Sequence, residues 1–220
     1  MAIEKNTLTF LKELALNNHR DWFEANRKRY LEAKENVLAT IAEIIQGAAR
    51  FDPSVKNIDA KDTIFRINRD VRFSKNKDSY KTNFAAVISS GGRKSTGAGF
   101  YFHLEPGGKT IAGGGVWMPE PAKLAAIRQE IDYNLPEFEA ILKNKVFVKV
   151  YGALSDETIK TKPKGYQADN PALPYLKQKS FVAFHGFSDK EVLAPGFTKE
   201  CISAFAAIQP LNAFLNRAQS

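Results

Sequence analysis

The spacing of apolar residues changes along the chain and divides it into three parts. Over residues 7–16, and again over roughly residues 19–49, apolar side chains recur every three or four positions, which is the period of an amphipathic α-helix. Asn18, followed three residues later by Asp21, resembles a capping box and predicts the start of the second, long helix. The sequence Phe-Asp-Pro-Ser at 51–54 ends that helix, because the residue before a proline disfavours helical backbone.

In the middle of the chain the period shortens to two. Short runs rich in β-branched and aromatic residues predict strands at 64–73, 84–89, 99–105 and 109–118. Pro106-Gly107-Gly108 separates the last two runs and predicts a hairpin, because glycine reaches the positive φ of tight turns. We therefore expect an antiparallel meander of three or four strands.

Helical spacing then returns. It predicts helices at 120–133, at 135–143 and from about residue 198 to the end, where Pro210 kinks or divides the helix. Residues 146–151 form an apolar run of either type, and 180–187 predict a last strand. Helices, then strands, then helices indicate an α+β fold. We expect one domain over residues 1–220, with a central antiparallel sheet packed by the long N-terminal helix and the C-terminal helices.

Length and composition limit the class of protein and the cellular compartment that we expect. A chain of 220 residues with 44% hydrophobic content can bury a sufficient core without disulfides, and its single cysteine, Cys201, cannot form one within the chain. The first residues, MAIEKNTLTFLKEL, lack a long apolar run, and no eighteen apolar residues follow one another. We expect a cytoplasmic protein without a membrane segment. The three histidines lack metal-ligand spacing and no nucleotide fingerprint is present, so neither a metal nor a cofactor is expected.

The net charge of +8 is concentrated in two segments. Residues 66–81 contain six basic and two acidic side chains, and residues 160–179 contain five basic and one acidic side chain. Each segment therefore carries a net charge of +4, and the rest of the chain is balanced. Clustered positive charge attracts polyanions or phosphates, although two solvated lysine-bearing loops would show the same pattern.

The first basic segment, RINRDVRFSKNKDSYK, has two interpretations. In an extended chain Arg66, Asp70 and Arg72 share one face, and they form either a structural ion-pair ladder or a pair of guanidinium forks for a carboxylate or phosphate. Arg69 falls on the apolar row, so its charge must be paired or reach solvent. Phe73 and Tyr80 would offer flat faces to bases. The predicted ligand-binding set is Arg66, Arg69, Arg72, Lys75, Lys77, Tyr80 and Lys81.

The second basic segment contains Lys162-Pro163-Lys164-Gly165-Tyr166, in which proline and glycine predict a turn with solvent-facing lysines. An ordinary exposed loop is the simpler interpretation. The functional alternative adds Lys162 and Lys164 to the site: the loop would fold over the strand that carries Arg66 and Arg72, and one basic cleft would form from two distant segments.

The candidate catalytic residues are weaker than the candidate ligand-binding residues. His103 and Glu105 lie on the polar row of a predicted hairpin strand, and together with Asp70 they are weak candidates for proton transfer. A structural histidine is the alternative. The glycines at 113–115 lie within a strand pattern, which indicates a bulge or a close backbone approach, or a ligand on bare backbone.

Several of these motifs occur together in a known family. The sequence RINRDVRFSKNKDSYKTNFAA is preceded by NNHRDWFEANRKRY and followed by GFYFHLEPGGKTIAGGGVWMP, PKGY and QPLNAFL. Over about residues 6–217 the chain resembles the bacterial and fungal family of domain of unknown function 2461. The resemblance implies a single-domain, cytosolic protein of mixed α and β structure, and it implies no activity, substrate or catalytic residue. Many relatives carry proline at the position of Ser79 and a His-Pro pair where this chain has Asn170-Pro171, so no histidine function in that late loop carries over.

The leading hypothesis is a binding module for a phosphate-bearing ligand, with nucleic acid ahead of a free nucleotide. The rival is an enzyme that acts on a small anionic substrate through Asp70, His103 or Glu105. In a third interpretation the arginine motif is purely structural. The sequence indicates neither the ligand nor the oligomeric state.

Overall fold

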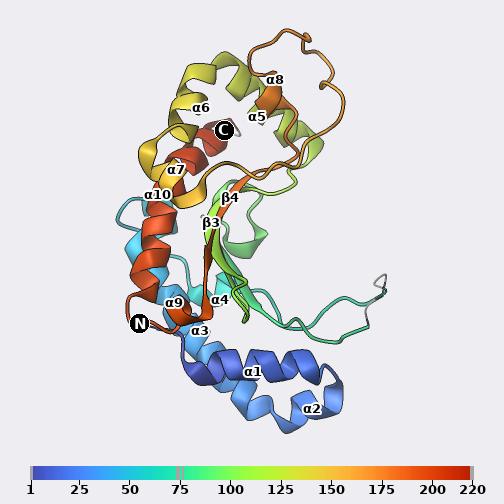
Figure 1. Cartoon of the computed structure of the whole chain (residues 1–220), viewed down its shortest axis with the longest axis vertical. Coiled ribbons are helices and arrows are strands. Elements are labelled where there is room, and N and C mark those ends of the chain that lie inside the picture. Colours follow the sequence, from blue (N-terminus) through green and yellow to red (C-terminus); the bar gives the residue numbers. More distant parts are fainter. Residues whose placement is uncertain (1, 73–74, 76, 219–220) are drawn as a thin grey trace.

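An antiparallel sheet of four strands forms the centre of the protein (Figure 1). The computed structural model describes residues 2–72, 75 and 77–218. The strands β1 (Phe84–Ile88), β2 (Gly99–Leu104), β3 (Thr110–Val116) and β4 (Phe181–Phe187) lie side by side in chain order. Gly107 and Gly108 take φ values of +85° and +72° in the turn between β2 and β3, as the hairpin prediction requires. The expected antiparallel meander is confirmed, and its fourth strand comes from the far end of the chain.

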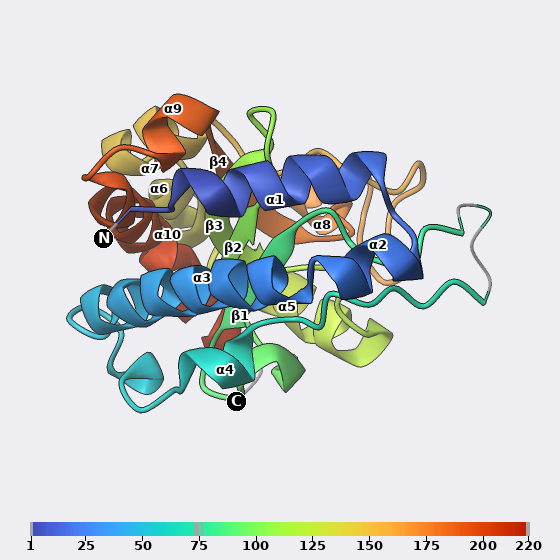
Figure 2. The same cartoon turned by 90° about the horizontal axis from the view of Figure 1, so that it is seen from below.

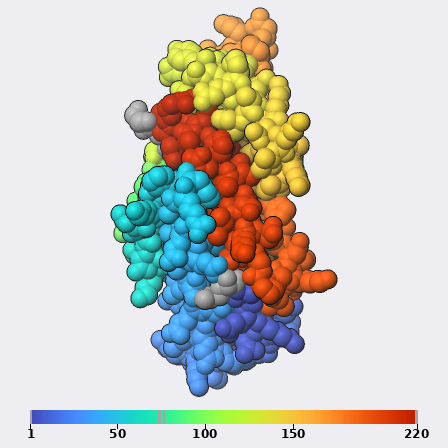
Figure 3. All heavy atoms as spheres, turned by 90° about the vertical axis from the view of Figure 1, so that its left-hand side faces the viewer, coloured from blue at the N-terminus to red at the C-terminus, as the bar shows by residue number. Residues whose placement is uncertain are grey.

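One face of the sheet is covered by two long helices. Along β2, alternate side chains point to this face, and Phe100, Phe102 and Leu104 are at most 1% exposed. They pack against α3 (Arg27–Ala48) and α10 (Phe197–Arg217), which cross this side of the molecule together in Figure 3. Phe100 stacks on Phe205 of α10 with ring centroids 4.7 Å apart. Because each fully buried aromatic side chain stabilises the fold by about 1.5–3 kcal/mol, this layer is the main core.

The remaining helices lie at the two ends of the molecule (Figures 1 and 2). At one end α1 (Lys5–Leu16) and α2 (Arg20–Ala25) pack against α3. At the other end lie α5 (Pro121–Tyr133), α6 (Leu135–Leu142), α7 (Lys145–Tyr151) and α8 (Leu173–Leu176). The short helices α4 (Ala60–Thr63) and α9 (Asp189–Val192) and the 3₁₀ turns Pro53–Val55 and Gly92–Lys94 complete the order. The fold is α+β, as predicted.

Neither of the two long helices, α3 and α10, lies over the second face of the sheet, the open face (Figure 1). The register pairs Val87 with Tyr101, Tyr101 with Gly113, and Gly113 with Phe184, so these residues share the open face. The two basic segments project on the same side as this face (Figures 1 and 2).

The predicted long helix over 19–49 is interrupted at Asn26. This residue leaves helical geometry (φ −106°, ψ 15°) between α2 and α3. Its side-chain amide donates to the carbonyl oxygen of Trp22 at 2.9 Å, and its side-chain oxygen accepts from Arg29 at 2.9 Å. The backbone bonds from Asn26 N–H to Trp22 and from Tyr30 N–H to Asn26 are kept, and the side-chain bonds stabilise the bend at Asn26 in a sequence whose apolar period continues.

The start of α2 also differs from the prediction. Its N-cap is His19, whose ring nitrogen accepts from the backbone N–H of Trp22 at 3.4 Å. Asn18, the predicted cap, instead binds the backbone of Tyr80: its amide donates to the carbonyl oxygen and its oxygen accepts from the N–H, both at 2.9 Å. Asn18 therefore binds a distant segment of the chain and does not cap the helix that follows it.

The predicted strand at 64–73 is wrong as a strand. Its described residues form only isolated bridges, Ile64 with Ala86 and Asn68 with Tyr80. Backbone N–H groups of Arg69 and Lys81 bond the carbonyl oxygens of Ser79 and Ile67 at 3.0 and 2.8 Å. The described residues of the segment 66–81 thus pair loosely with one another as an arm that leaves the edge of β1 (Figure 1).

Near the C-terminus the ambiguous run at 146–151 is helix α7, and Pro210 lies inside α10, which it does not divide. Cys201, at the start of α10, is fully buried, and burial raises the pKa of its thiol. It therefore serves as a core residue.

Candidate functional site: the open face of the sheet

A cleft of about 620 Å³ lies on the open face. Val87, Tyr101, Ile111 and Phe184 from the four strands form its floor. Its walls come from the segment before β1, from residues 95–97 and from the connection between β3 and α5. Most of this lining is apolar, so the cleft suits a ligand with flat or apolar parts.

The glycines of β3 bring the aromatic floor together. The rings of Tyr101 and Phe184 meet edge to face at 5.8 Å on either side of Gly113. A Cβ at Gly113 would lie 2.0 Å from the carbonyl oxygen of Ala183, and one at Gly115, where φ is +117°, would lie 1.9 Å from that of Phe181. The predicted close backbone approach is confirmed, and β4 itself is the neighbour that requires glycine.

Trp117 and Met118 form an exposed rim beside this floor. Their side chains are 58% and 56% exposed, although both line the cleft. Met118 has a φ of +43°, the one positive value at a non-glycine position in the described chain. Its N–H donates to the hydroxyl of the buried Ser180 at 2.9 Å, which holds the strained turn in place. This turn could not be identified from the sequence, because the strain appears only in the backbone dihedral angles.

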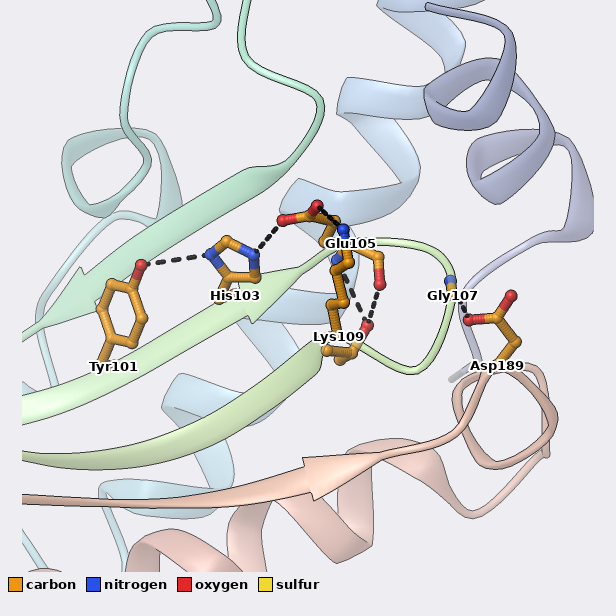
Figure 4. A network of polar contacts seen from close by, with 7 residues as sticks. Tyr101, His103, Glu105, Gly107, Lys109 and Asp189 are labelled. Atoms are coloured by element: carbon orange, nitrogen blue, oxygen red, sulfur yellow. Dashed lines mark hydrogen bonds and ion pairs between the residues drawn. The ribbon is translucent and has the colours of Figure 1, made fainter. Parts of the chain in front are cut away.

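A polar chain runs along β2 from the cleft to the hairpin (Figure 4). The Tyr101 hydroxyl lies 3.3 Å from Nδ1 of His103, and Nε2 of His103 lies 2.9 Å from the Glu105 carboxylate. Lys109 pairs with the other oxygen of Glu105 at 3.2 Å. Because a carboxylate only accepts, the imidazole proton belongs on Nε2, and Nδ1 is left to accept from Tyr101. The sequence predicted that Tyr101, His103 and Glu105 share a polar row, and it assigned no chemical role to Tyr101.

The end of this polar chain is anchored at the hairpin. Backbone N–H groups of Gly107 and Gly108 donate to the carboxylate of Asp189 at 2.8 and 3.1 Å, and Asp189 pairs with Lys12 at 2.9 Å (Figure 4). These bonds tie the turn to α9 and α1. Glu105, which directly precedes the turn, is thereby fixed relative to His103.

The arm formed by residues 66–81 uses two of its arginines internally. Arg72 binds Asp70 through two hydrogen bonds, of 2.9 and 2.6 Å, and these hold the pKa of the Asp70 carboxyl below its usual value. Arg69 pairs with Asp78 at 3.7 Å. Within the described residues no hydrogen bond or ion pair links Asp70 to His103 or Glu105, so the three predicted proton-transfer groups do not form one cluster.

Arg66 and Lys81 differ from the paired arginines. In the described chain neither has an acidic partner within ion-pair distance. The Lys81 ammonium lies over the ring of Phe65, 5.3 Å from its centroid, and Phe65 lines the cleft. Burial lowers the pKa of Lys81, and the positive charge of Arg66 lowers it further. The two cations therefore lie near one another beside Phe65 at the edge of the cleft, and the charge of Arg66 also lowers the pKa of Asp70.

Tyr80 does not provide the predicted stacking surface. Its ring is 6% exposed and stacks on Phe23 of α2 at 4.0 Å. The prediction of a base-stacking ring at this position is wrong, because the ring belongs to the core. Phe73, the other predicted ring, lies outside the described residues. Lys75 and Lys77 are exposed on the arm, and Lys77 donates to the carbonyl oxygen of Val71 at 3.1 Å.

The second basic segment lies elsewhere. Lys162 and Lys164 are exposed, and Lys162 donates to the carbonyl oxygen of Tyr166 at 2.7 Å within its own loop. Figure 1 places this loop at the end of α5 and α8, whereas the arm of residues 66–81 projects near the other end of the molecule. The prediction that both segments form a single recess is wrong. They lie at opposite ends of the same open side.

Among the described residues, no three His, Cys, Asp or Glu side chains lie close enough together to hold a metal ion. In the same part of the chain, no helix combines the length and the apolar character needed to cross a membrane.

These features define an α+β protein with a four-stranded antiparallel sheet, one face of which is left open and carries a cleft beside a polar chain. The family model described as "Conserved hypothetical protein (DUF2461)" matches residues 6–214, and the chain belongs to this family. The resemblance noted in the sequence is thereby confirmed. Comparisons with curated proteins and with solved structures gave no match.

Proposed function

We propose that the open face binds a phosphate-bearing ligand, and that the ligand is a single-stranded nucleic acid. The observation that carries the proposal is the cation pair Arg66 and Lys81 at the edge of the cleft. Burial and, to a smaller extent, the positive charge of Arg66 disfavour the charged form of Lys81 and lower its pKa. A phosphate between them would relieve the repulsion and accept hydrogen bonds from both.

The floor and rim of the cleft suit bases. Phe65, Tyr101, Trp117 and Phe184 all line it, and Trp117 exposes more than half of its side chain. Stacking on such rings contributes about 1–3 kcal/mol per base and tolerates any sequence, because every base has a π-face. The aromatic surface comes from these residues and not from Tyr80.

The two basic segments favour a polymer over a free nucleotide. Each carries a net charge of +4, and they lie at opposite ends of the open side (Figure 1). A small ligand in the cleft would reach only one of them, whereas a strand laid along the sheet would approach both. Clustered positive charge at two ends of a groove also steers a polyanion into it.

The test is the affinity for a fluorescein-labelled oligothymidylate, measured by fluorescence anisotropy from 50 to 200 mM salt. We expect log Kd to rise linearly with log salt concentration, because neutralising phosphates releases counterions. Arg66→Ala with Lys81→Ala removes two phosphate contacts and should reduce the slope by about 1.4, at roughly 0.7 per contact for a single strand.

A charge-matched control is Lys149→Ala with Lys199→Ala. Both lysines are exposed on α7 and α10, on the covered side of the sheet, and we expect affinity and salt slope to stay at the wild-type values. An equal loss of affinity in both double variants would mean that binding depends only on the net charge of the protein. No binding at the lowest salt, or an affinity independent of salt, would remove the proposal.

A further inference from the structure

Tyr101, His103 and Glu105 have the arrangement of a nucleophile, a base and a group that orients the base. Their contacts run in one line from hydroxyl to imidazole to carboxylate, at 3.3 and 2.9 Å (Figure 4). Activated hydroxyl nucleophiles have the same order: the base lies within hydrogen-bond reach of the hydroxyl, and a third group fixes the base.

The position of each member suits this chemistry. Tyr101 lines the cleft, while the side chains of His103 and Glu105 are 17% and 20% exposed. The imidazole is therefore sheltered, and the hydroxyl is the member that faces a ligand. Burial raises the pKa of Tyr101, and the charge of Glu105 raises it further. The resting hydroxyl thus keeps its proton and needs a base at the moment of attack.

We propose that Tyr101 is a catalytic nucleophile that attacks the phosphorus of a phosphodiester bound in the cleft. This inference rests on the proposed function for its substrate class. A bond forms between Oη of Tyr101 and phosphorus, and the bond between phosphorus and the leaving oxygen breaks. The Tyr101 proton moves to Nδ1 of His103, while the leaving oxygen departs on the opposite side of phosphorus and takes a proton from water. The hydroxide formed then takes the proton of the imidazolium. The product is a tyrosyl phosphodiester and an alcohol, so atoms and charges balance.

Two other groups assist this step. Glu105 is a positioning residue, because it holds the His103 ring and stabilises the imidazolium that forms. Lys123 lines the same cleft, donates to the hydroxyl of Thr96 and, in the described chain, has no carboxylate partner. Its remaining N–H groups would stabilise the negative charge that develops on the phosphoryl oxygens.

The experiment uses the full chain and bis(4-nitrophenyl) phosphate as the probe. Attack by Tyr101 releases one 4-nitrophenolate per chain, which is followed by its absorbance, and leaves a nitrophenyl phosphate on the protein. We expect a burst of one equivalent and, by peptide mass spectrometry, an adduct on Tyr101. Tyr101→Phe keeps the ring and should abolish both signals. Tyr133→Phe is the matched control, since Tyr133 is 72% exposed on α5 and should leave both unchanged.

The base and its positioning residue have separate readouts. His103→Gln should lower the burst rate constant by roughly 10²–10⁴-fold, the usual contribution of a general base. Glu105→Gln should lower the burst rate constant with little change in the affinity for the probe, because the His103 ring loses the carboxylate that fixes its orientation. A merely structural role of Glu105 would change the melting temperature and leave the burst rate constant at the wild-type value.

The two proposals can fail separately. A protein that binds oligothymidylate with the expected salt dependence but forms no adduct overturns the nucleophile and leaves the binding function. An adduct on Tyr101 in a protein that binds no oligonucleotide removes nucleic acid and leaves the reactive tyrosine. An adduct that appears equally on other tyrosines, or persists in His103→Gln at the wild-type rate, also overturns the inference.

Discussion

Arg66 and Lys81 support an anion site, because neither forms an ion pair in the described chain and Lys81 lies over Phe65 at the cleft. Arg69 and Arg72 have the same charge but are bound to Asp78 and Asp70. The sequence placed all four in one basic segment and could not separate them, because the pairing depends on how the arm folds back on itself.

Arg66→Ala should raise the pKa of Lys81. The guanidinium disfavours the charged ammonium, so its removal favours protonation, while burial keeps the pKa below its ordinary value. The measurement is a pH titration of the Lys81 side-chain signal by heteronuclear NMR. Arg72→Ala is the control, because that guanidinium is bound to Asp70. An unchanged Lys81 pKa in Arg66→Ala would show that the two cations do not interact.

Gly115→Ala should destabilise the protein far more than Gly107→Ala. Both positions have positive φ, which costs a residue with a side chain about 1–2 kcal/mol. At Gly107 nothing lies within 4 Å of the added Cβ, whereas at Gly115 the carbonyl oxygen of Phe181 would lie at 1.9 Å. Urea unfolding compares the two variants. Equal losses would contradict the close approach of β3 and β4.

The arm of residues 66–81 is joined to the N-terminal helices by one side chain. Asn18 in the turn between α1 and α2 makes two hydrogen bonds to the backbone of Tyr80, whose ring stacks on Phe23. This contact connects segments 62 residues apart. It fixes the base of the arm, and with it the position of Lys81.

Asn18→Ala should lower the free energy of unfolding by about 1–3 kcal/mol, because it leaves backbone groups of Tyr80 unsatisfied in a partly buried place. Urea denaturation monitored by circular dichroism gives the value. Gln129→Ala, at an exposed position of α5, should stay within about 0.5 kcal/mol of the wild type. A loss as small as that of the control would mean that the arm is held without Asn18.

The helices and strands that depend only on the local pattern of apolar and polar residues were predictable. The hairpin of β2 and β3 followed from alternation and glycine, and α5, α6 and α10 followed from apolar spacing. Residues 64–73 also alternate between apolar and polar side chains, because any extended segment with one buried side does so. Whether such a segment joins a sheet depends on its neighbours, and here it pairs mainly with its own return path. The break at Asn26 was equally hidden, since side-chain bonds cause it and neither proline nor glycine marks it.

On the scale of the entire fold, the sequence indicated the charges but not their arrangement. Both basic segments were identifiable by composition, yet the single recess expected from them does not form, because they extend from opposite ends of the open side (Figure 1). The row of His103 and Glu105 was also predictable. That this row lies beside an uncovered cleft follows from where α3 and α10 pack, which no local pattern contains.

The central claim is that the open face is where a nucleic acid binds, and the two tryptophans test it most directly. Trp117 lines the cleft and is 58% exposed, whereas Trp22 is half-buried against Phe10 in the N-terminal helices. Their indole N–H signals can be followed separately by NMR while oligothymidylate is added. The Trp117 signal should move progressively to saturation, with little change at Trp22. Saturating binding that shifts Trp22 and leaves Trp117 unmoved would place the ligand elsewhere and contradict the account.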